Sequence, residues 1–449
     1  MDNRSGLVKS RTKVQVPAPS PDDTGAPASR LNFKETNHNV FKGGTTLLPT
    51  LQKPKVLILT GSLGDGHKQA AQALLEASGH YDSEAEVEVV DFMEWTHPRI
   101  HQLGKYCYLQ WIKHFPSLYG YLFRLTRTDN TYSQLFKRIR LFQLGRMLEL
   151  LLTVRPSVVV STFPSAAAAM SVLKTHGLTT VPTVTVITDH TDHSYWVHPG
   201  TDRYAVGSQQ VRDLLVRQGV QPSDVSVTGI PIRPQFAVRQ DGAALRDKYG
   251  LDRKAKVVLV MGGGLGMFGR GLDDMLAADY GGRLVQFVIV CGRNDKLKRQ
   301  LEARAGQCRH KLVVTGYVEE IHELMATADV MITKPGGLST AEATAMKLPM
   351  LLVKPLPGQE QDNAAYLNRA GLAVQAAPGE APSALLGRLL AHPEELEAMR
   401  ARASMLRTRN AAFKTLRAVL QASADSGQSP IVRMPAKALR KTRAAFAAR

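Results

Sequence analysis

Runs of β-branched and aliphatic residues alternate with stretches of helical periodicity from Pro54 onward. Runs of this kind predict strands that are buried on both faces of parallel sheets. The first series is Lys55–Leu59, Val87–Val90, Val158–Ser161 and Thr183–Ile187. After the proline-bearing segment Thr228–Pro234, a second series follows: Val257–Met261, Val285–Val290, Leu312–Thr315, Val330–Ile332 and Met350–Val353. The two series predict an α/β fold with two doubly wound Rossmann-like domains, residues 54–240 and 250–390, that face each other across a cleft.

Helical periodicity and proline positions place the predicted helices. One helix is expected over Lys68–Ala77, directly after the first strand, and a longer one over Pro393–Ser423. Within residues 101–148, Pro116 interrupts an apolar stripe and is expected to begin a second helix. The stripe comprises Tyr108, Trp111, Phe115, Leu118, Leu122 and Leu125. Its steps of three and four residues predict a buried helix face.

The composition is that of a globular protein, with 44% hydrophobic and 21% charged residues in a chain of 449. This excludes full-length disorder and fibrous repeats. The three cysteines lie far from any CxxC spacing, which disfavours a disulfide framework or a zinc site and fits a reducing compartment. No apolar run approaches the roughly 20 residues that span a bilayer, and the start lacks the apolar region of a secretory signal. Residues 1–50 have a composition typical of disorder.

The formal net charge of +18 is concentrated in three segments. Residues 101–148 hold eight basic residues against one acidic, and the basic tail 426–449 holds six against none. Residues 1–50 hold seven against four, so the remaining chain is nearly neutral. A nucleic-acid surface spread over the predicted domains is therefore disfavoured, because such a surface needs distributed positive charge.

Residues 101–148 also contain ten aromatic residues, interleaved with the basic ones. Such a stretch suits an anionic bilayer, where rings lie at the headgroup level and each Lys or Arg contributes about 1 kcal/mol. It also suits single-stranded nucleic acid, whose bases stack on aromatic rings. In the third interpretation the rings are simply helix core under a solvated basic face. This stretch alone leaves the three interpretations open.

The predicted first strand runs into a glycine-rich loop, Thr60–His67, and then into a helix. Its three glycines allow the backbone to approach a ligand closely, and the helix N-terminus offers N–H donors. His67 stands at that N-terminus, where the positive end of the helix dipole disfavours imidazolium. A neutral imidazole can accept a proton as a general base. Because His67 also shares an apolar helix face, a merely packed histidine is the alternative.

A second glycine-rich loop, Gly262–Gly269, follows the strand Val257–Met261 and is typical of a turn that approaches phosphate. In a dinucleotide-binding fingerprint, an acidic residue follows about 20 residues later. The strand Val285–Val290 ends instead in Cys-Gly-Arg-Asn. A dinucleotide-dependent oxidoreductase is therefore disfavoured.

Two later strand ends carry polar loops suited to a sugar. Strand Val330–Ile332 enters a Pro-Gly-Gly turn, and Ser339-x-x-Glu342 predicts a capping box. The alternative role of Glu342 is a carboxylate that accepts hydrogen bonds from vicinal hydroxyls. Strand Met350–Val353 enters the loop Lys354–Asn363, which is crowded with amides and carboxylates. At the carboxyl end of a strand, such a cluster can bind a polyhydroxylated ligand.

Together these motifs resemble those of the diacylglycerol glycosyltransferases, the monogalactosyldiacylglycerol synthases and diglucosyldiacylglycerol synthases of family 28. More distantly, the chain resembles the lipid-linked N-acetylglucosaminyltransferase of peptidoglycan synthesis. The resemblance covers about Val56 to Gly371. Its most specific parts are the GxGH loop ending at His67, Trp196-Val-His-Pro with Asp202-Arg-Tyr204, Gly229–Phe236, Thr333–Gly337 and Gln359-Glu-x-x-Asn363. Asp65 and Leu265 depart from the plant enzymes, which leaves donor and acceptor preference open.

The resemblance implies a GT-B fold, with a UDP-sugar donor in the C-terminal domain and an acceptor lipid at the N-terminal one. It implies His67 as the catalytic base, with Asp189 orienting His67 or acting as the base itself. The implied donor-binding residues are Gly263, Gly264 and Gly266 at the diphosphate, Glu342 at the ribose, Gln359 and Glu360 at the transferred sugar, and also Lys334, Gly336, Gly337 and Asn363. The implied acceptor or membrane residues are Trp111, Phe115, Lys137, Arg138, Arg140 and Trp196.

The implied reaction is an inverting transfer of galactose or glucose from a UDP-sugar to the hydroxyl of diacylglycerol, giving a β-glycosyl diacylglycerol. Glycine-loop amides, a helix N-terminus and Lys334 can stabilise the diphosphate leaving group without a DxD metal site, so no metal and no cofactor are expected. Anionic lipid is a candidate requirement. The alternatives are an amino-sugar transferase of the peptidoglycan type, an epimerase or another UDP-sugar-binding protein. The basic aromatic stretch argues against an epimerase.

The charge acquires a role from this resemblance, because an acceptor dissolved in a bilayer requires its enzyme to reach that bilayer. We expect a cytoplasmic protein bound peripherally to the inner face of the membrane, with anionic lipid as a partner and no nucleic acid. Neutralising Lys137, Arg138 and Arg140 is expected to weaken vesicle binding, as is high salt.

Overall fold

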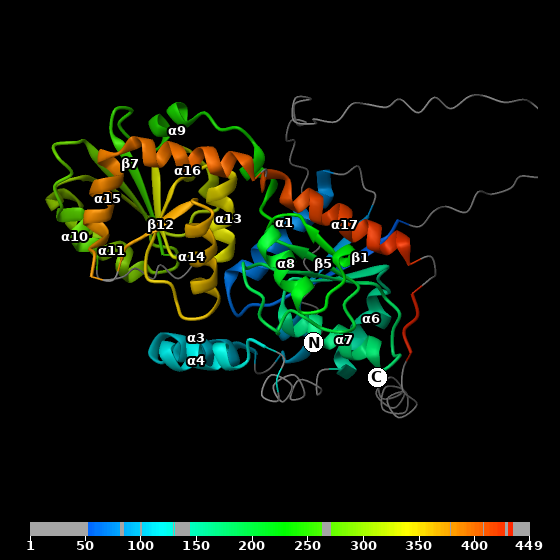
Figure 1. Ribbon diagram of the computed structural model, residues 1–449. Helices are drawn as coiled ribbons and strands as arrows, with labels where there is room; N and C mark the ends of the chain where they lie inside the picture. Colours follow the sequence, from blue (N-terminus) through cyan, green and yellow to red (C-terminus); the bar gives the residue numbers. More distant parts are fainter. Residues whose placement is uncertain are drawn as a thin grey trace, which may run out of the picture. The chain divides into compact units, whose positions relative to one another are not determined.

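The computed structural model describes residues 53–80, 85–98, 101–128, 130, 144–262, 271–377, 379–406, 408–426 and 430–433. The described residues from Pro54 onward belong to one compact unit (Figure 1). Two parallel six-stranded sheets with flanking helices build the described part of this unit. This arrangement confirms the predicted α/β class with two Rossmann-like sheets.

The first sheet has the strand order β2-β1-β3-β4-β5-β6, and every neighbouring pair is parallel. Its strands are β1 (Lys55–Thr60), β2 (Glu86–Asp91), β3 (Val158–Ser161), β4 (Thr183–Val186), β5 (Arg203–Val206) and β6 (Val225–Val227). Val56 to Leu59 in β1 are completely buried. The apolar run at the start of the pattern is therefore covered on both faces, as parallel strands require.

The second sheet has the order β12-β11-β10-β7-β8-β9 and is also parallel. Its strands are β7 (Lys256–Met261), β8 (Val285–Val290), β9 (Lys311–Thr315), β10 (Val330–Thr333), β11 (Met350–Leu352) and β12 (Ala373–Gln375). The order reverses between β1 and β3 in the first sheet and between β7 and β10 in the second. Ligands of such sheets bind at the carboxyl ends of the strands beside these reversals.

Helices connect the strands and cover the sheets. The α-helices are α1 (Asp65–His80), α2 (Phe92–Thr96), α3 (His101–His114), α4 (Pro116–Leu125), α6 (Leu144–Val154), α7 (Pro164–Thr175), α8 (Gln209–Arg217), α9 (Gly242–Lys248), α10 (Leu272–Ala277), α11 (Asp295–Arg304), α12 (Ile321–Thr327), α13 (Gly337–Ala345), α14 (Gln359–Arg369), α15 (Pro382–Ala391), α16 (Pro393–Met405) and α17 (Ala411–Asp425). The described residues also form the short 3-10 helices η3 (Pro222–Asp224), η4 (Pro234–Ala237), η5 (Ala305–Gln307) and η6 (Thr408–Asn410).

The nine predicted strands all form, and Pro116 begins α4 as expected. The pattern missed β5, β6 and β12, which have only four, three and three residues. Equally short strands were recognised where every residue is aliphatic or buried, but β6 and β12 are sheet-edge strands with one buried residue each, and β5 begins with Arg203 and Tyr204. The first strand and the helix after it both extend beyond their predicted ends, by one residue in β1 and by three at each end of α1.

The long helix predicted over Pro393–Ser423 is instead two helices, α16 and α17, with η6 before α17 (Figure 1). The reason is that the chain changes partner. Leu396 and Met399 of α16 pack in the core of the second sheet, whereas Val419 and Ala422 of α17 pack with β1 and β3 of the first. The C-terminal part of the chain therefore completes the core of the N-terminal sheet.

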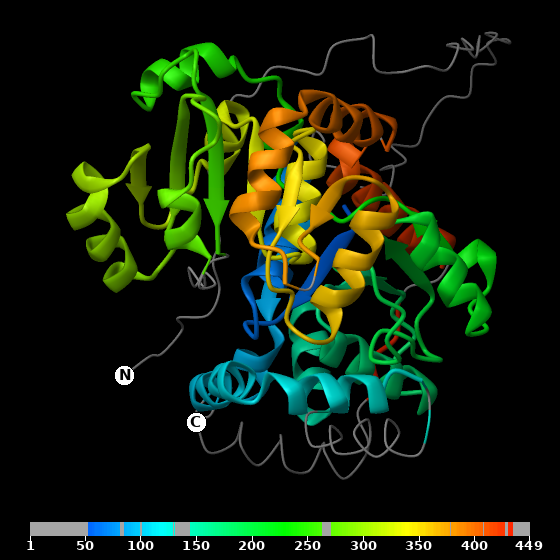
Figure 2. The same ribbon diagram turned by 60° about the vertical axis from the view of Figure 1, so that its left-hand side comes forward.

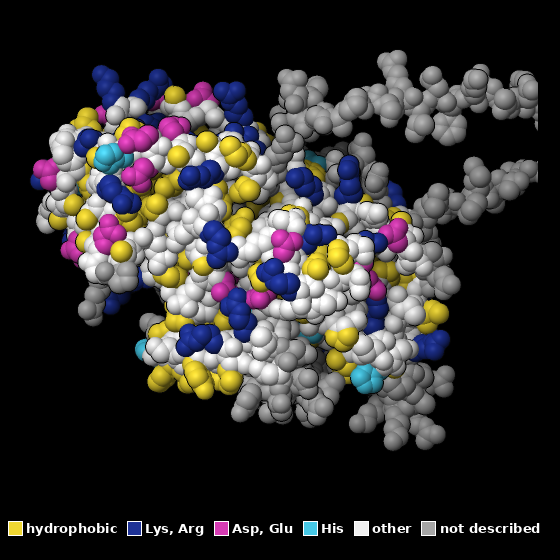
Figure 3. All heavy atoms as spheres, viewed as in Figure 1, with side chains coloured by type: hydrophobic (Ala, Val, Ile, Leu, Met, Phe, Trp, Pro, Cys, Tyr) yellow, Lys and Arg dark blue, Asp and Glu magenta, His cyan; other side chains and the backbone are white. Residues whose placement is uncertain are grey.

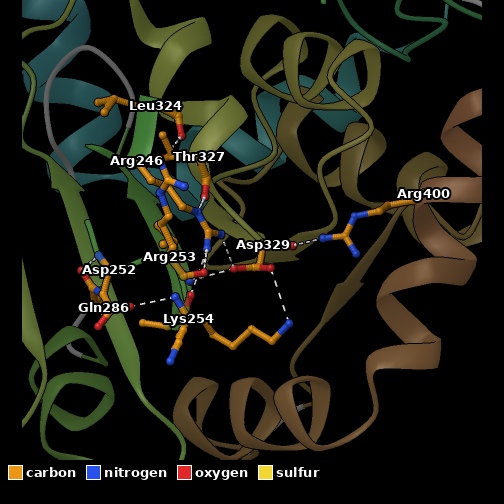
Figure 4. Close-up of polar contacts among 12 residues, drawn as sticks. Arg246, Asp252, Arg253, Lys254, Gln286, Leu324, Thr327, Asp329 and Arg400 are labelled. Atoms are coloured by element: carbon orange, nitrogen blue, oxygen red, sulfur yellow. Dashed lines mark hydrogen bonds and ion pairs between the residues drawn. The ribbon is translucent and has the colours of Figure 1, made fainter. Parts of the chain in front are cut away.

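An ionic cluster around Asp329 holds the amino ends of β7 and β10 together (Figure 4). Its Oδ2 accepts hydrogen bonds from Arg246 Nη2 at 2.9 Å and from the Val257 amide at 2.8 Å. Arg400 of α16 donates to the Asp329 carbonyl at 2.8 Å. These contacts lie at the opposite strand ends from the ligand-binding edge, so we interpret them as structural.

Candidate active site

A cavity of about 330 Å³ opens at the carboxyl ends of β7, β8 and β10. Met261, Val290 and Thr333, the last residues of these strands, line it. Asp65, Gly66 and Gln69 of α1 contribute the wall from the first half of the chain. The cavity therefore lies beside the reversal of the second sheet and is completed by the helix that follows β1.

Several residues predicted to bind a donor do line this cavity: Lys334, Gly336, Gly337, Glu342 and Glu360. Gly263, Gly264 and Gly266 lie outside the described residues, although the preceding Gly262 is part of the lining. Gln359 and Asn363 stand on α14, next to the cavity-lining Glu360 or one turn beyond it. Their part in donor binding stays a prediction.

Helix α13 begins at Gly337, with Gly336 as its N-cap. A side chain at Gly337 would not fit, because a Cβ there would lie 1.9 Å from the Thr188 carbonyl oxygen. Gly336 brings no side-chain cap, so an anion at this helix end would be stabilised by the amides of the first turn. The predicted Ser339–Glu342 capping box is wrong. Ser339 is already the third residue of the helix, because the Pro-Gly-Gly turn starts the helix earlier.

Glu342 lies one turn into α13 and is only 9% exposed. Burial raises the pKa of its carboxyl to about 8, and the Arg233 guanidinium counteracts this rise. Arg233 also lines the cavity and donates from Nε to both carboxylate oxygens of Glu76, each at 3.0 Å. The carboxyl is therefore largely protonated at neutral pH.

A second pair of ionisable groups, Lys334 and Glu360, lines the same cavity. Burial lowers the pKa of the Lys334 ammonium, and the nearby Glu360 carboxylate opposes this shift. Burial raises the pKa of Glu360, whose Oε2 accepts a hydrogen bond from the Leu356 amide at 2.7 Å. The Glu360 carboxylate thus joins the start of α14 to the preceding Leu356 within the segment Lys354–Asn363.

His67 occupies the first turn of α1 at the reversal of the first sheet. Its Nδ1 lies 3.1 Å from Thr188 Oγ1, and its carbonyl accepts a hydrogen bond from Thr162 Oγ1 at 3.1 Å. The imidazole packs against the rings of Phe163 and Trp196, with centroid separations of 5.4 and 5.9 Å. When Nδ1 donates to the Thr188 hydroxyl, Nε2 is the basic nitrogen.

Trp196 was predicted to contact the acceptor or the membrane. The structure buries it to 4% exposure against His67 and among core residues such as Tyr204 and Val206. A direct contact between this ring and a membrane surface is incompatible with such burial. Because the Trp196 ring lies beside the His67 imidazole, a role of Trp196 near the acceptor stays a prediction.

Asp189 lies three residues after β4, directly after the Thr188 that contacts His67. The charges of Asp189 and His67 each act on the pKa of the other group. Asn363 of α14 donates from Nδ2 to Asp189 Oδ1 at 2.8 Å and to the Pro335 carbonyl at 3.0 Å. Its Oδ1 accepts from the His190 amide at 2.6 Å. Asn363 is completely buried, and both polar atoms of its side chain are hydrogen-bonded. Its partners in the structure are Asp189, the His190 amide and the Pro335 carbonyl of the turn before α13.

The environments of His67 and Asp189 push their pKa values toward each other. Burial lowers the pKa of His67, although the Asp189 charge works in the opposite direction. Burial raises the pKa of Asp189, although the bond from Asn363 and the charge of His67 counteract this. A neutral imidazole results at neutral pH, which is the form a general base requires.

The helical hairpin formed by α3 and α4 differs from the predicted buried stripe. Trp111 packs edge-on against Tyr119 at a centroid separation of 5.7 Å. Phe115 and Leu118, in contrast, are 61% and 49% exposed, so the stripe is not buried throughout. Exposed apolar side chains of the hairpin are Leu103, Tyr106, Phe115, Leu118 and Tyr121. Figure 3 shows hydrophobic side chains gathered along the lower edge of this hairpin, with basic side chains next to them.

Three predicted membrane residues, Lys137, Arg138 and Arg140, lie outside the described residues. The part of the chain that the structure describes holds no cluster of three or more His, Cys, Asp or Glu suited to a metal ion. In that same part, no helix combines the length and apolar character needed to cross a bilayer.

The structure adds residues that the sequence did not single out. Arg233 and Phe236 line the cavity and lie in the Gly229–Phe236 motif, which was quoted for the resemblance but given no role. Arg293, after β8, forms an ion pair with the cavity residue Asp65 at 3.3 Å. Its guanidinium lies 5.1 Å from the ring centroid of Tyr317. Only the pairing of distant segments brings these side chains together.

Two family models match the chain in succession. Residues 67–232 match the monogalactosyldiacylglycerol (MGDG) synthase model, and residues 257–418 match the C-terminal domain of glycosyltransferase family 28. The first match begins at His67 and the second at β7.

Curated relatives and solved structures agree with these matches. The chain is 35% identical over 374 residues to the processive diacylglycerol beta-glucosyltransferase of Bacillus pumilus, covering 82% of this chain and 95% of that protein. It is 34% identical to the protein of the same name from Bacillus subtilis, with the same coverage. In fold it is similar to Acinetobacter baumannii MurG, with a TM-score of 0.54, 14% identity and 82% and 99% of the two chains covered.

The fold is therefore of the GT-B type that the sequence predicted. The two matched ranges include His67, Glu342 and Gln359. The chain belongs to the diacylglycerol glycosyltransferases of glycosyltransferase family 28.

Proposed function

We propose that the protein transfers glucose from UDP-glucose to the hydroxyl of diacylglycerol, giving a β-glucosyl diacylglycerol. The observation that carries the proposal is the His67–Asp189 pair beside a cavity of about 330 Å³. The wall of this cavity contains Gly66, the residue directly before His67. The proposed base therefore lies directly beside the wall of the proposed donor cavity. Transfer between two substrates requires such proximity. The names of the relatives favour glucose over galactose.

The donor is assigned to the cavity by the chemistry of its walls. The diphosphate fits the amides at the start of α13 together with Lys334, because both present positive charge. Glu342 accepts hydrogen bonds from the ribose hydroxyls, and Gln359 and Glu360 contact the glucose. The family resemblance also assigns Gly263, Gly264 and Gly266, which lie outside the described residues, to the diphosphate.

The proposed reaction is a single displacement. His67 removes the proton from the diacylglycerol hydroxyl, whose oxygen then forms a bond to the anomeric carbon. The bond from that carbon to the diphosphate oxygen breaks, and UDP leaves with the electron pair. Asp189 stabilises the imidazolium that forms. One displacement inverts the α-linked donor to a β-product, with no covalent intermediate on the protein.

The proposal is tested with purified protein, diacylglycerol in anionic vesicles, and UDP-glucose or UDP-galactose. We expect lipid chromatography to show β-glucosyl diacylglycerol with the first donor. A product formed only with UDP-galactose would correct the sugar, and no glycolipid with either donor would overturn the proposal. UDP-N-acetylglucosamine, added in parallel, tests the amino-sugar alternative.

Binding of UDP-glucose is expected to release close to one proton at pH 7. Burial raises the pKa of Glu342 to about 8, and hydroxyl donors favour its ionised form, so ligand binding lowers this pKa. The affinity for UDP-glucose should therefore rise between about pH 6 and pH 8. Calorimetry in two buffers of different ionisation enthalpy measures the proton release.

The Glu342→Gln variant is the matched control for this linkage, because it keeps the shape and cannot titrate. It should bind UDP-glucose more weakly and with no proton release from this site. Equal proton release in the variant and the wild type would remove Glu342 from the ribose site.

We infer that the α3–α4 hairpin docks on the cytoplasmic face of a membrane that contains anionic lipid. Leu118 and Tyr121 are exposed on α4 and Phe115 directly before it, and residues 101–148 carry eight basic residues against one acidic. Exposed apolar side chains beside basic ones match a surface whose interior is apolar and whose headgroups are negative.

Replacing both Phe115 and Leu118 with alanine should weaken binding to phosphatidylglycerol vesicles about tenfold or more, because two exposed apolar side chains lose their transfer into the bilayer. The matched control is Leu284→Ala with Met405→Ala, which removes side chains that are 65% and 77% exposed elsewhere. Sedimentation with vesicles measures both variants. Equal loss in both, or binding that salt does not weaken, would contradict docking by this hairpin.

A further inference from the structure

The inner face of the α3–α4 hairpin packs on the loop that leads into α14 (Figure 2). Tyr119 donates from its hydroxyl to Gln359 Oε1 at 2.7 Å. Gly120 allows the closest approach, since a Cβ there would lie 2.3 Å from the Pro357 Cβ. The Gly358 backbone, at φ +105°, lies next to the rings of Tyr119 and Phe123. The two segments therefore fit together without room for an added methyl group.

Arg127, just after α4, adds a charged contact to the same loop region. Its Nη1 donates to both carboxylate oxygens of Asp362 at 2.9 and 3.0 Å. Its Nη2 pairs with Asp192 at 2.6 Å. Asp362 also accepts a hydrogen bond from Thr191 at 2.7 Å. The first turn of α14 is thus fastened both to the hairpin and to the loop that carries Asp189.

The Tyr119 contact fixes the orientation of the Gln359 amide, which stands next to the cavity-lining Glu360. With its amide oxygen accepting from the phenol, Gln359 has its NH₂ donors directed elsewhere. The phenol is itself held in place, because the Trp111 and Tyr108 rings pack edge-on against it at 5.7 and 6.4 Å. Tyr119 can therefore fix the side-chain conformation of Gln359.

We propose that α4 is a positioning element for the donor-sugar loop, with Tyr119 orienting Gln359 so that docking of the hairpin on lipid strengthens binding of the transferred sugar. The proposal rests on the proposed function, in which Gln359 contacts the glucose and the hairpin contacts the membrane. Tyr119 acts through Gln359 and is a positioning residue. Nothing in this mechanism requires it to touch either substrate.

The physical basis is that one short helix carries both contacts. Leu118 and Tyr121, with Phe115 directly before the helix, present the outer face, whereas Tyr119 and Phe123 present the inner one. A helix of ten residues is rigid, so restraining its outer face on a bilayer also restrains its inner face. Coupling of this kind is reciprocal, so donor binding should in turn strengthen vesicle binding.

The test uses the full chain and vesicles of phosphatidylcholine with about 30% phosphatidylglycerol, which gives an anionic surface. The vesicles contain no diacylglycerol, so no transfer takes place during the measurement. Competition with a fluorescent uridine nucleotide gives the affinity for UDP-glucose and for UDP, with and without vesicles. In the wild type, vesicles should tighten UDP-glucose binding by roughly fivefold or more and leave UDP binding unchanged. UDP is unaffected because it lacks the sugar that Gln359 contacts.

The Tyr119→Phe variant keeps the ring and loses only the hydroxyl. It should bind UDP-glucose roughly fivefold more weakly, with UDP binding unchanged and the tightening by vesicles lost. Tyr280→Phe is the matched control, since it removes a hydroxyl that also donates a hydrogen bond, to the Met275 carbonyl at 2.8 Å, in a part of the core that belongs neither to the hairpin nor to the cavity lining. Equal weakening of UDP and UDP-glucose, or wild-type behaviour of Tyr119→Phe in both measurements, would overturn the proposal.

The Gln359→Ala variant separates the possible failures. If this variant weakens UDP-glucose and spares UDP while Tyr119→Phe does neither, the positioning role of Tyr119 is wrong and the site assignment stands. If Gln359→Ala leaves UDP-glucose binding unchanged, Gln359 does not contact the sugar, and both statements fall. Absence of vesicle binding in the wild type would overturn the coupling together with the docking.

Discussion

Replacing His67 with alanine is expected to reduce glycosyl transfer by about three orders of magnitude or more, since a positioned general base contributes roughly 10²–10⁴ in rate. The imidazole is held between Thr188, Phe163 and Trp196, so a solvent molecule in its place would lack both its basicity and its orientation. UDP affinity should stay within about twofold of the wild type, because His67 is not among the residues that line the donor cavity.

The control for this variant is His80→Ala, which removes a histidine from the other end of the same helix. The His80 ring packs against the Phe413 ring with 6.0 Å between the centroids. It stands at the opposite end of α1 from the cavity, so transfer should persist. Rates are measured by following glycolipid formation at saturating UDP-glucose. If His67→Ala retains turnover near the wild-type rate, the base is Asp189.

Replacing Asp189 with asparagine should lower kcat by about a hundredfold. The change removes the negative charge that opposes the lowering of the His67 pKa and that stabilises imidazolium in the transition state. Asparagine keeps an oxygen that can accept the 2.8 Å hydrogen bond from Asn363, so the loop should remain in place. The thermal unfolding midpoint and the UDP affinity check that it does.

The dependence of kcat/KM on pH should also change in Asp189→Asn, and the direction of the change can be predicted. His67 must be neutral to accept a proton, and burial lowers its pKa below the ordinary value of 6.5. The acid limb of kcat/KM in the wild type should therefore fall below pH 6.5. Without the Asp189 charge the pKa of His67 drops further, so the limb should move to still lower pH in Asp189→Asn. A limb displaced toward higher pH would contradict the pairing.

A double variant tests whether the two residues act as one unit. Residues that depend on each other give strongly non-additive losses. His67→Ala with Asp189→Asn should therefore be little slower than His67→Ala alone. Multiplicative losses would assign Asp189 an independent role at the acceptor.

Local pattern was sufficient for much of the fold. The apolar runs of β1, β7 and β8 are completely or almost completely buried, and such strands are recognisable because both faces must be apolar. Pro116 marked a helix start for a steric reason that does not depend on its partners. The glycine-rich loop ending at His67 was likewise visible from spacing alone, and the structure places that loop at the reversal of the first sheet.

Local pattern failed where a second segment decided the outcome. The apolar spacing in residues 101–148 indicated one buried stripe, yet the donor-side loop covers Phe123 and leaves Phe115 and Leu118 exposed. The predicted capping box at Ser339 was displaced, because the Pro-Gly-Gly turn makes Gly336 the N-cap, three residues earlier, where Gly337 fits against the Thr188 carbonyl.

The sequence by itself determined the two parallel sheets, the loops at their carboxyl ends and the residue types that can perform glycosyl transfer, since these follow from periodicity, glycine spacing and side-chain chemistry. Only the tertiary structure decided how those groups work together. Asn363 reaches Asp189 across 174 residues, and Tyr119 reaches Gln359 across 240. Hydrogen bonds between such distant positions, and the burial that shifts the pKa values of His67 and Glu342, exist only once the packed chain has excluded water from between them.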